Sequence, residues 1–524
     1  MKNDHQLTPS RRREIEREME AFEEKERRNL GLPTEETIHF IDPSNPHFEK
    51  SDRGTTTILL GGLTIAQDVL IQAALEALGY RIEPLPCPGN EDLQLGKEFG
   101  NRGQCNPTYF TVGSLLRKLI ALREGGMSTD DIIAQYVFLT AGACGPCRFG
   151  TYATEYRKAL RDSGFEGFRV LLFQQQGGLK QAAGFGSGIE FSPRFFTQII
   201  RALIAGDLLN AIGYRIRPYE ITHGQTDETL ERCKEILGTA LRDRSSLLMA
   251  LRRCRKELNR IEVDRLQSKP KVMIIGEFWA MTTEGAGNYH LQRFLESEGA
   301  EVEIQFVTSW LLYMLWQNRY DIRRRIGLRS QDTRSKGLAG RNGRFQIVRL
   351  YAAEQCLKIM FRTMAHAIGL QRCHLPDMDT MAGQADSYYD VELRGGEGHM
   401  EVGKVIDSVS GRRSHMIISV KPFGCMPSSG VSDGIQTAVI SRFPEAIFCP
   451  VETSGDGDVN FQSRVLMHLF KARNQANEEF RGELRKRGLT LDEAHRRISK
   501  SQRKATYFPP HTCAGLGANV VATL

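Results

Sequence analysis

Tyr136-Val137-Phe138-Leu139 is a short apolar run, and the turn Cys144-Gly145-Pro146-Cys147 follows it closely. A segment of helical period then begins near Phe149. A strand, a turn and a helix in this order form the repeating unit of parallel α/β layers, because each crossover returns the chain to the same edge of the sheet. The stretch therefore predicts a parallel sheet with two cysteines beyond the carboxyl end of one strand.

The same pattern recurs along the chain. Further strands are predicted at residues 57–60, 168–173, 271–276, 301–304, 415–420 and 446–449, with a helix at about 66–78. We therefore expect an α/β protein with two Rossmann-like parallel-sheet domains that face a central cleft. The expected parts are a charged helical N-terminal extension and linker (1–55), a first α/β domain (56–226), an interdomain helical segment (227–268) and a second α/β domain (269–524).

Composition limits the class of protein. The chain has 524 residues, of which 40% are hydrophobic and 25% charged, as in ordinary globular proteins of two or three domains. We expect no membrane span, because no run looks long and apolar enough, and the N-terminus lacks a signal-peptide core, which favours the cytoplasm. A net charge of +7 without zinc-finger spacing or an RNA-binding aromatic strand makes nucleic acid an unfavoured partner. Eleven cysteines in a reducing compartment do not indicate a disulfide framework.

Three separate segments place cysteines where ligands bind in α/β sheets. Cys144 and Cys147 follow one predicted strand, Cys425 follows another, and Cys105 precedes a helix predicted at 109–122. Ligands bind beyond the carboxyl ends of parallel strands, so these turns can converge if the two domains face each other. A thiolate just before a helix is also stabilised by the free N–H groups of the first turn.

The residues around these cysteines suit an iron–sulfur cluster. Glycine or proline lies within two residues of each, which allows sharp turns and a close approach of the backbone to a bulky group. Arg148 and Lys421 add positive charge that favours ionised thiols. Thiolates are the usual cluster ligands, and three separated donors leave a fourth iron position to Cys144, to another group or to substrate.

Other interpretations stay open. Cys144 and Cys147 form the redox motif of thioredoxin-like proteins, although Ala143 stands where those proteins usually carry an aromatic residue. Structural zinc normally needs a second close pair of donors. Cysteines in apolar helices are typically small buried hydrophobes, and we assign no role to Cys233, Cys254 or Cys356. The chain contains no GxxxxGK[ST] loop, so we do not expect it to hydrolyse ATP.

Three blocks resemble the 2-hydroxyacyl-CoA dehydratase family, most closely the C-terminal region of fused CoA-substrate-specific enzyme activases. The blocks are residues 95–107 around Cys105, residues 147–152 and residues 422–427, and their order matches as well. A fourth block, from Gly276 to Ala300, is similar to the opening strand and helix of the family's second domain. The resemblance covers about residues 57–473. It implies that Cys105, Cys147 and Cys425 bind a [4Fe–4S] cluster, with Cys144 as a fourth ligand or a bystander.

The resemblance also implies a function. A separate ATP-hydrolysing activator would deliver low-potential electrons to the cluster, for radical dehydration or reduction of an acyl-CoA, and the ATPase domains of the fused relatives are missing here. The chain would then be a dehydratase or reductase component, in a homo- or hetero-dimer. Residues 426–429, Met-Pro-Ser-Ser, depart from the fused relatives and leave the substrate open. Glu277 and Asn288 are possible cleft residues, although a strand-end glutamate is as often a helix cap.

Two other functions remain at this point. A thiol–disulfide redox protein would use Cys144 and Cys147 and would be insensitive to substitution of Cys105. A non-catalytic electron-transfer scaffold would hold the cluster without binding an acyl-CoA. Loss of iron in a Cys105 variant would favour the cluster hypothesis over the thiol–disulfide redox protein. Calorimetry with acyl-CoA ligands would separate the electron-transfer scaffold from the enzyme.

Overall fold

Two parallel sheets form the framework of the protein. The computed structural model describes residues 9–31, 48–142, 147–174, 188–326, 342–393, 398–455 and 457–524. The first sheet has the order β2-β1-β3-β4 and the second has the order β6-β5-β7-β8, with every pair parallel. The predicted α/β class with two parallel sheets is therefore confirmed. The strands are β1 (Thr57–Leu60), β2 (Arg81–Pro84), β3 (Tyr136–Gly142), β4 (Arg169–Gln174), β5 (Lys271–Gly276), β6 (Glu301–Ile304), β7 (Met416–Pro422) and β8 (Ile447–Thr453).

The first sheet is covered by helices on both faces because its strands alternate their side chains. Ile58 and Leu60 join one core cluster, whereas Leu59 between them joins another. The first face is covered by α2 (Ile65–Glu76) and α7 (Pro193–Ile216). The second face is covered by α4 (Asn106–Glu124), α5 (Thr129–Gln135) and α6 (Tyr152–Asp162).

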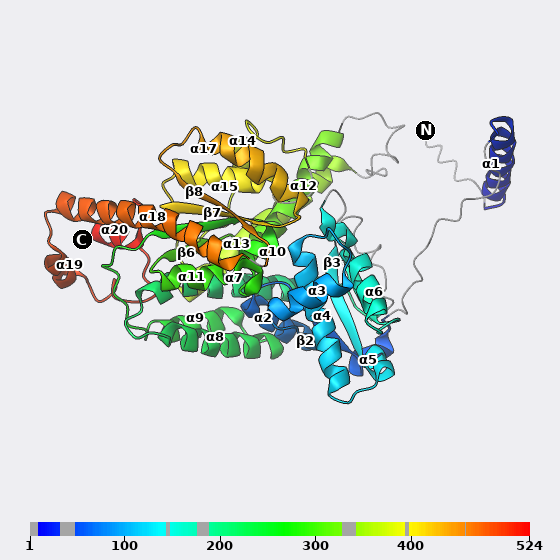
Figure 1. The fold of residues 1–524 in the computed structure, drawn as a ribbon, viewed down its shortest axis with the longest axis horizontal. Helices are drawn as coiled ribbons and strands as arrows, with labels where there is room; N and C mark the ends of the chain where they lie inside the picture. The colour runs from blue at the N-terminus through cyan, green and yellow to red at the C-terminus, as the bar shows by residue number, and fades with distance from the viewer. Residues whose placement is uncertain are drawn as a thin grey trace. The chain divides into compact units, whose positions relative to one another are not determined.

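The second sheet is covered in the same way. One face packs on α10 (Phe278–Thr282), α11 (Leu291–Ser297) and α18 (Asp458–Arg487). The other packs on α14 (Met378–Ala385), α15 (Gly398–Ser410) and α17 (Gln436–Ile440), as Figure 1 shows for β7 and β8. A short helix, α16 (Met426–Gly430), follows β7, and α19 (Leu491–Arg497) and α20 (Leu516–Val521) lie near the C-terminus.

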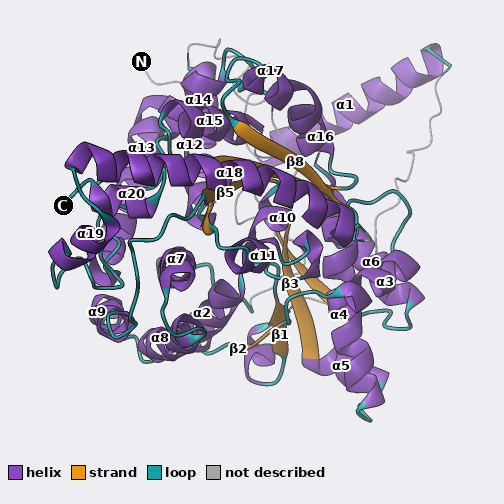
Figure 2. Cartoon of the chain, turned by 60° about the vertical axis from the view of Figure 1, so that its left-hand side comes forward, coloured by secondary structure: helices purple, strands orange, loops and turns teal. Residues whose placement is uncertain are grey.

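A helical layer connects the two sheets. The segment predicted as interdomain helices forms α8 (Gln225–Arg242), which packs with α2 and α7, and α9 (Leu247–Leu258), which packs with α8 (Figure 2). α12 (Val307–Arg325) and α13 (Gly343–Ile368) extend this layer, so one apolar cluster runs from the first sheet through all of these helices. Residues 45–524 form one compact unit and residues 1–44 another.

The N-terminal unit contains a helix, as its charge pattern predicts. α1 (Pro9–Asn29) carries ion pairs between residues four apart, Glu23 with Arg27 at 2.9 Å and Glu24 with Arg28 at 2.5 Å. Pairs at this spacing stabilise a solvated helix by about 0.3–0.5 kcal/mol each.

One expectation about apolar segments needs correction. The helical stretch Pro193–Tyr219 is, among the described residues, long and apolar enough to cross a membrane by length and composition, contrary to the expectation of no such run. Its most apolar window is 61% buried inside the protein, where α7 packs against α2, α8, α12 and β6. Core packing therefore accounts for the hydropathy of this helix.

Close packing of two helices fixes the position of the Cys105 segment. α3 (Asn90–Phe99) crosses α4 so tightly that a Cβ atom on Gly96 would lie 1.8 Å from the Tyr109 carbonyl oxygen. A Cβ atom on Gly113 would lie 1.7 Å from the Asp92 carbonyl oxygen. Only glycine permits this approach of two backbones, so α3 packs closely against the first half of α4, which follows Cys105.

Candidate functional site

Cys105 occupies the position just before α4. It is the N-cap residue of that helix, and Pro107 stands in the first turn, as is typical of helix starts. The side chain is 7% exposed. Its Sγ atom lies 3.2 Å from Thr108 Oγ1 and 3.3 Å from the Tyr152 hydroxyl. The sulfur is thus buried, faces the positive end of a helix and has two hydroxyl partners.

Cys147 begins the segment that follows β3. It caps the 3-10 helix η2 (Arg148–Thr151), and its Sγ atom accepts a hydrogen bond from the Phe149 amide at 3.5 Å. The residue is half-buried. η2 runs directly into α6, which carries Tyr152. Cys147 and the hydroxyl partner of Cys105 therefore come from one continuous segment.

Cys425 has the same local setting after β7. It is the N-cap residue of α16, with Pro427 in the first turn, and it is 7% exposed. Its neighbours Phe423 and Met426 are 56% and 52% exposed. All three cysteines thus cap helix starts, where backbone N–H groups favour a thiolate or another anion.

Direct backbone contacts join the Cys105 and Cys425 segments. The Asn106 amide donates to the Phe423 carbonyl oxygen at 3.0 Å, and Asn106 Nδ2 donates to the Thr453 carbonyl oxygen at 2.8 Å. Gly424 lies so close that a Cβ atom there would stand 3.1 Å from Cys105 Cα. Cys105 and Gly424, which are 319 positions apart in the sequence, therefore lie side by side, and the Cys105 segment contacts the ends of β7 and β8.

A second set of contacts joins the Cys147 segment to the Cys105 loop. The Arg148 guanidinium donates to the Gly103 carbonyl oxygen. Glu155 on α6 accepts hydrogen bonds of 2.8–3.0 Å from the same loop, donated by the amide and side chain of Asn101 and the side chain of Gln104. The Cys105 loop thus contacts both of the other cysteine segments, which follow the carboxyl ends of β3 and β7. In each sheet this end lies beside the switch point between the first and third strands, where ligands bind in such folds.

The meeting of segments does not by itself form a site for one ion. Within the described ranges, no group of three or more His, Cys, Asp or Glu side chains is arranged to hold a single metal ion. A [4Fe–4S] cluster differs because each cysteine binds a different iron, so its thiolates need not converge on one point. Cys144, the fourth predicted ligand, lies outside the described residues.

The positive charges predicted near the sulfurs have partners. Arg148 contacts the Gly103 carbonyl oxygen, and Lys421 pairs with Glu452 at 3.7 Å. Arg148 therefore ties the Cys147 segment to the Cys105 loop in addition to contributing charge.

Buried acidic groups flank the cysteine segments on the side of the second sheet. Glu277 caps α10 and accepts hydrogen bonds from the amides of Trp279 at 3.1 Å and Ala280 at 2.8 Å. Burial raises the pKa of Glu277, and the two hydrogen bonds lower it by less, so the pKa stays above its usual value. Burial, and then the charge of Glu277, raises the pKa of Glu401 to about 8. Glu401 is therefore mostly protonated at neutral pH.

A second acidic group lies where β1, β2 and β5 end. Burial raises the pKa of Asp68 to about 8, and its Oδ1 atom has no hydrogen-bond partner. Glu284 accepts a hydrogen bond from the Ile65 amide at 2.8 Å, and burial raises its pKa as well. Cys87 lies beside them, 3.7 Å from Thr283 Oγ1. Asp68 is thus a carboxyl group that holds a proton near neutral pH at this end of the strands.

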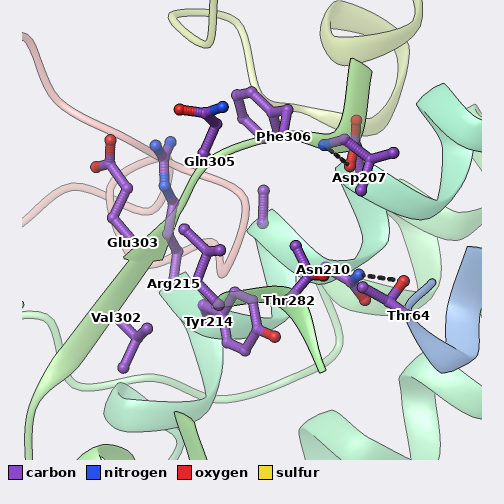
Figure 3. A pocket seen from close by; sticks show the side chains of 13 residues that line it. Thr64, Asp207, Asn210, Tyr214, Arg215, Thr282, Val302, Glu303, Gln305 and Phe306 are labelled. Carbon is purple, nitrogen blue, oxygen red and sulfur yellow. Dashed lines mark hydrogen bonds between the residues drawn. The ribbon is translucent and has the colours of Figure 1, made fainter. Parts of the chain in front are cut away.

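A small cavity lies along α7 and β6, away from the cysteines. Its volume is about 30 Å³, room for about one water molecule. Figure 3 shows Asp207, Asn210, Arg215 and Phe306 in its lining, and no cysteine lines it. Asp207 is fully bonded to neighbouring donors. The cavity is therefore not part of the cysteine site.

Several predicted residues are structural. Glu277 is a helix cap, the alternative considered from the sequence. Asn288 is fully buried and its Nδ2 atom donates to the carbonyl oxygens of Ala280 and Thr283, both at 2.8 Å. Cys233 and Cys254 are buried, as expected, but Cys356 is exposed on α13, so its predicted burial was wrong. The apolar residues of α13 cover more of the helix than the stripe that faces the core, and Cys356 lies on the part that faces solvent.

Sequence reasoning missed the hydroxyl partners and the protonated carboxyls. Tyr152 lies in a block used for the family resemblance, yet nothing in the sequence shows that it reaches back to Cys105. Asp68 carried a signal, since it stands in the first turn of a markedly apolar helix. Glu401 carried none, because its burial depends on α16 and α17, which are distant in the sequence.

The fold and site define a class: a two-sheet α/β protein with cysteine-capped helices at the facing strand ends. No protein-family model matches the chain, and no curated protein matches it at a significant level.

Proposed function

We propose that this protein binds a [4Fe–4S] cluster through Cys105, Cys147 and Cys425, and that the cluster serves electron transfer to an acyl-CoA. The observation that carries the proposal is the contact between Gly424 and Cys105, which puts two cysteine-capped helix starts from different sheets side by side. Such a cluster accepts and passes on one electron at a time.

The donor set fits the cluster chemically. Thiolates need stabilisation in a buried place, and each of these cysteines lies at the N-terminus of a helix. Cys105 also has two hydroxyl groups at its sulfur. The glycine at 424 lets the backbone of the Cys425 turn approach the Cys105 segment closely, which supports the placing of these two ligands at one site.

The electron source is proposed to be a separate ATP-hydrolysing activator, as the family resemblance implies. The exposed side chains of Phe423 and Met426 beside Cys425 offer an apolar surface close to the cluster ligands, which suits a transient protein contact. The substrate is proposed to be an acyl-CoA. Asp68 and Glu401 would be the proton donors that dehydration or reduction of a thioester requires.

Single cysteine substitutions test the proposal. We expect Cys105→Ser, Cys147→Ser and Cys425→Ser, purified without oxygen, each to lose most of the iron bound by the unmodified protein. Cys356→Ser is the matched control, because Cys356 is an exposed thiol on α13 and should keep full iron content. Full iron retention in the Cys425 variant would remove that residue from the site. Cys144→Ser determines whether a fourth thiolate participates.

Calorimetry separates the enzyme from an electron carrier. Titration of the iron-loaded protein with acyl-CoA thioesters should release or absorb heat in a saturable way. A protein that carries the cluster but binds no acyl-CoA would exclude the substrate half of the proposal and leave the cluster half intact.

A further inference from the structure

The hydroxyl groups of Tyr152 and Thr108 form a small polar cluster with the sulfur of Cys105. The sulfur lies 3.3 Å from the Tyr152 hydroxyl and 3.2 Å from Thr108 Oγ1. The Thr108 hydroxyl is also close to that of Tyr152. All three side chains are at least nine-tenths buried, with exposures of 7% for Cys105, 6% for Tyr152 and 1% for Thr108. Water is therefore largely excluded from these contacts.

The direction of these hydrogen bonds follows from the state of the sulfur. A thiol can donate or accept, but a metal-bound thiolate has no proton and can only accept. Both hydroxyl groups would then donate to Cys105 whenever it is a ligand.

We propose that Tyr152 and Thr108 are positioning residues that raise the reduction potential of the cluster by donating hydrogen bonds to the Cys105 sulfur. The inference rests on the proposed function. Reduction adds negative charge to the cluster and its sulfurs, and a hydrogen bond to sulfur stabilises the more negative state. Removal of either hydroxyl should therefore make the cluster harder to reduce.

A matched pair of tyrosines tests the proposal. Tyr152→Phe removes the hydroxyl beside the sulfur. Tyr156→Phe removes an equally buried hydroxyl one turn further along α6, where Tyr156 faces Thr111 and Thr140 instead of a cysteine. Thr108→Val, which keeps the shape of the side chain, is a second variant in case Tyr152→Phe fails to retain iron.

The readouts are the midpoint potential from an electron paramagnetic resonance titration and the hyperfine coupling of exchangeable protons. We expect Tyr152→Phe and Thr108→Val each to shift the reduction equilibrium roughly tenfold, a potential lower by about 59 mV for a one-electron couple, and Tyr156→Phe to leave it unchanged. In Tyr152→Phe, one exchangeable-proton coupling should disappear. A loaded cluster whose potential is the same in all three variants would overturn this inference alone. Unmodified protein that assembles no cluster would overturn it together with the proposed function.

Discussion

Gly424 lies against Cys105 so closely that a Cβ atom at position 424 would stand 3.1 Å from Cys105 Cα and 2.9 Å from the Gln104 carbonyl oxygen. Its φ angle is +79°, in the left-handed region that side chains disfavour. The contact holds the end of β7 against the start of α4. It also brings together the segments of two predicted ligands, Cys105 and Cys425.

Gly424→Ala should separate these two segments. Alanine at this φ costs about 1–2 kcal/mol, and the Cβ atom would also collide with backbone that has little freedom to move. We expect a lower free energy of unfolding in chemical denaturation and a loss of bound iron. Gly430→Ala is the control, because no atom lies within 4 Å of a Cβ there. Equal iron content in the two variants would contradict the structural role of Gly424.

Asp207 joins two long helices through the start of α12. Its carboxylate accepts hydrogen bonds from the amides of Val307 at 2.9 Å and Thr308 at 2.7 Å, and from Thr308 Oγ1 at 2.6 Å. Asp207→Ala leaves these buried donors unpaired and should lower the free energy of unfolding by about 3 kcal/mol or more. Thr308→Val should cost about 1 kcal/mol.

The exposed residue Asp162, paired with Lys158 at 2.9 Å, provides the contrast. Surface ion pairs contribute about 0–1 kcal/mol, so Asp162→Ala should change the denaturation midpoint very little. If Asp207→Ala were as mild as Asp162→Ala, the capping role of Asp207 would be excluded.

Glu401 should make stability depend on pH. Burial raises its pKa from 4.5 to about 8, so the folded protein binds a proton that the unfolded chain has lost between these values. Stability should therefore fall as the pH rises from about 4.5 to 8, by at most about 1.4 kcal/mol per pH unit. The glutamine side chain of the Glu401→Gln variant is neutral at every pH, so this variant should not lose stability in this way.

Chemical denaturation of both proteins at pH 5 and pH 8 checks this prediction. The Glu401→Gln variant should gain stability relative to the unmodified protein as the pH rises. Glu445→Gln, at an exposed position, controls for general charge effects. If the unmodified protein and the Glu401→Gln variant differed in stability by the same amount at both pH values, Glu401 would have to be ionised throughout.

Most of the framework could be predicted because the strands are apolar and regularly spaced. The strand missed was β2 (Arg81–Pro84), which contains Arg81, Glu83 and Pro84 and lies at an edge, where polar residues and proline are tolerated. β8 was predicted only to residue 449 and continues to Thr453, because Pro450 also lies on an edge strand. Local pattern shows which segments form strands, but the position of an edge depends on the whole sheet.

The sequence predicted the cysteines that follow strands, but not the contacts that join the cysteine segments to one another. Cys147 and Cys425 follow strands, so the general rule for α/β sheets indicated where they lie. The contact of Asn106 with Phe423, and the reach of Tyr152 to Cys105, depend on how the helical layer sets one sheet against the other. No short sequence pattern contains that information.

The decisive measurement is the content of iron and acid-labile sulfide in the unmodified protein, purified without oxygen and then reconstituted. We predict about four of each per chain, with a brown colour and a paramagnetic signal on reduction. A colourless protein that contains neither element after reconstitution would contradict it.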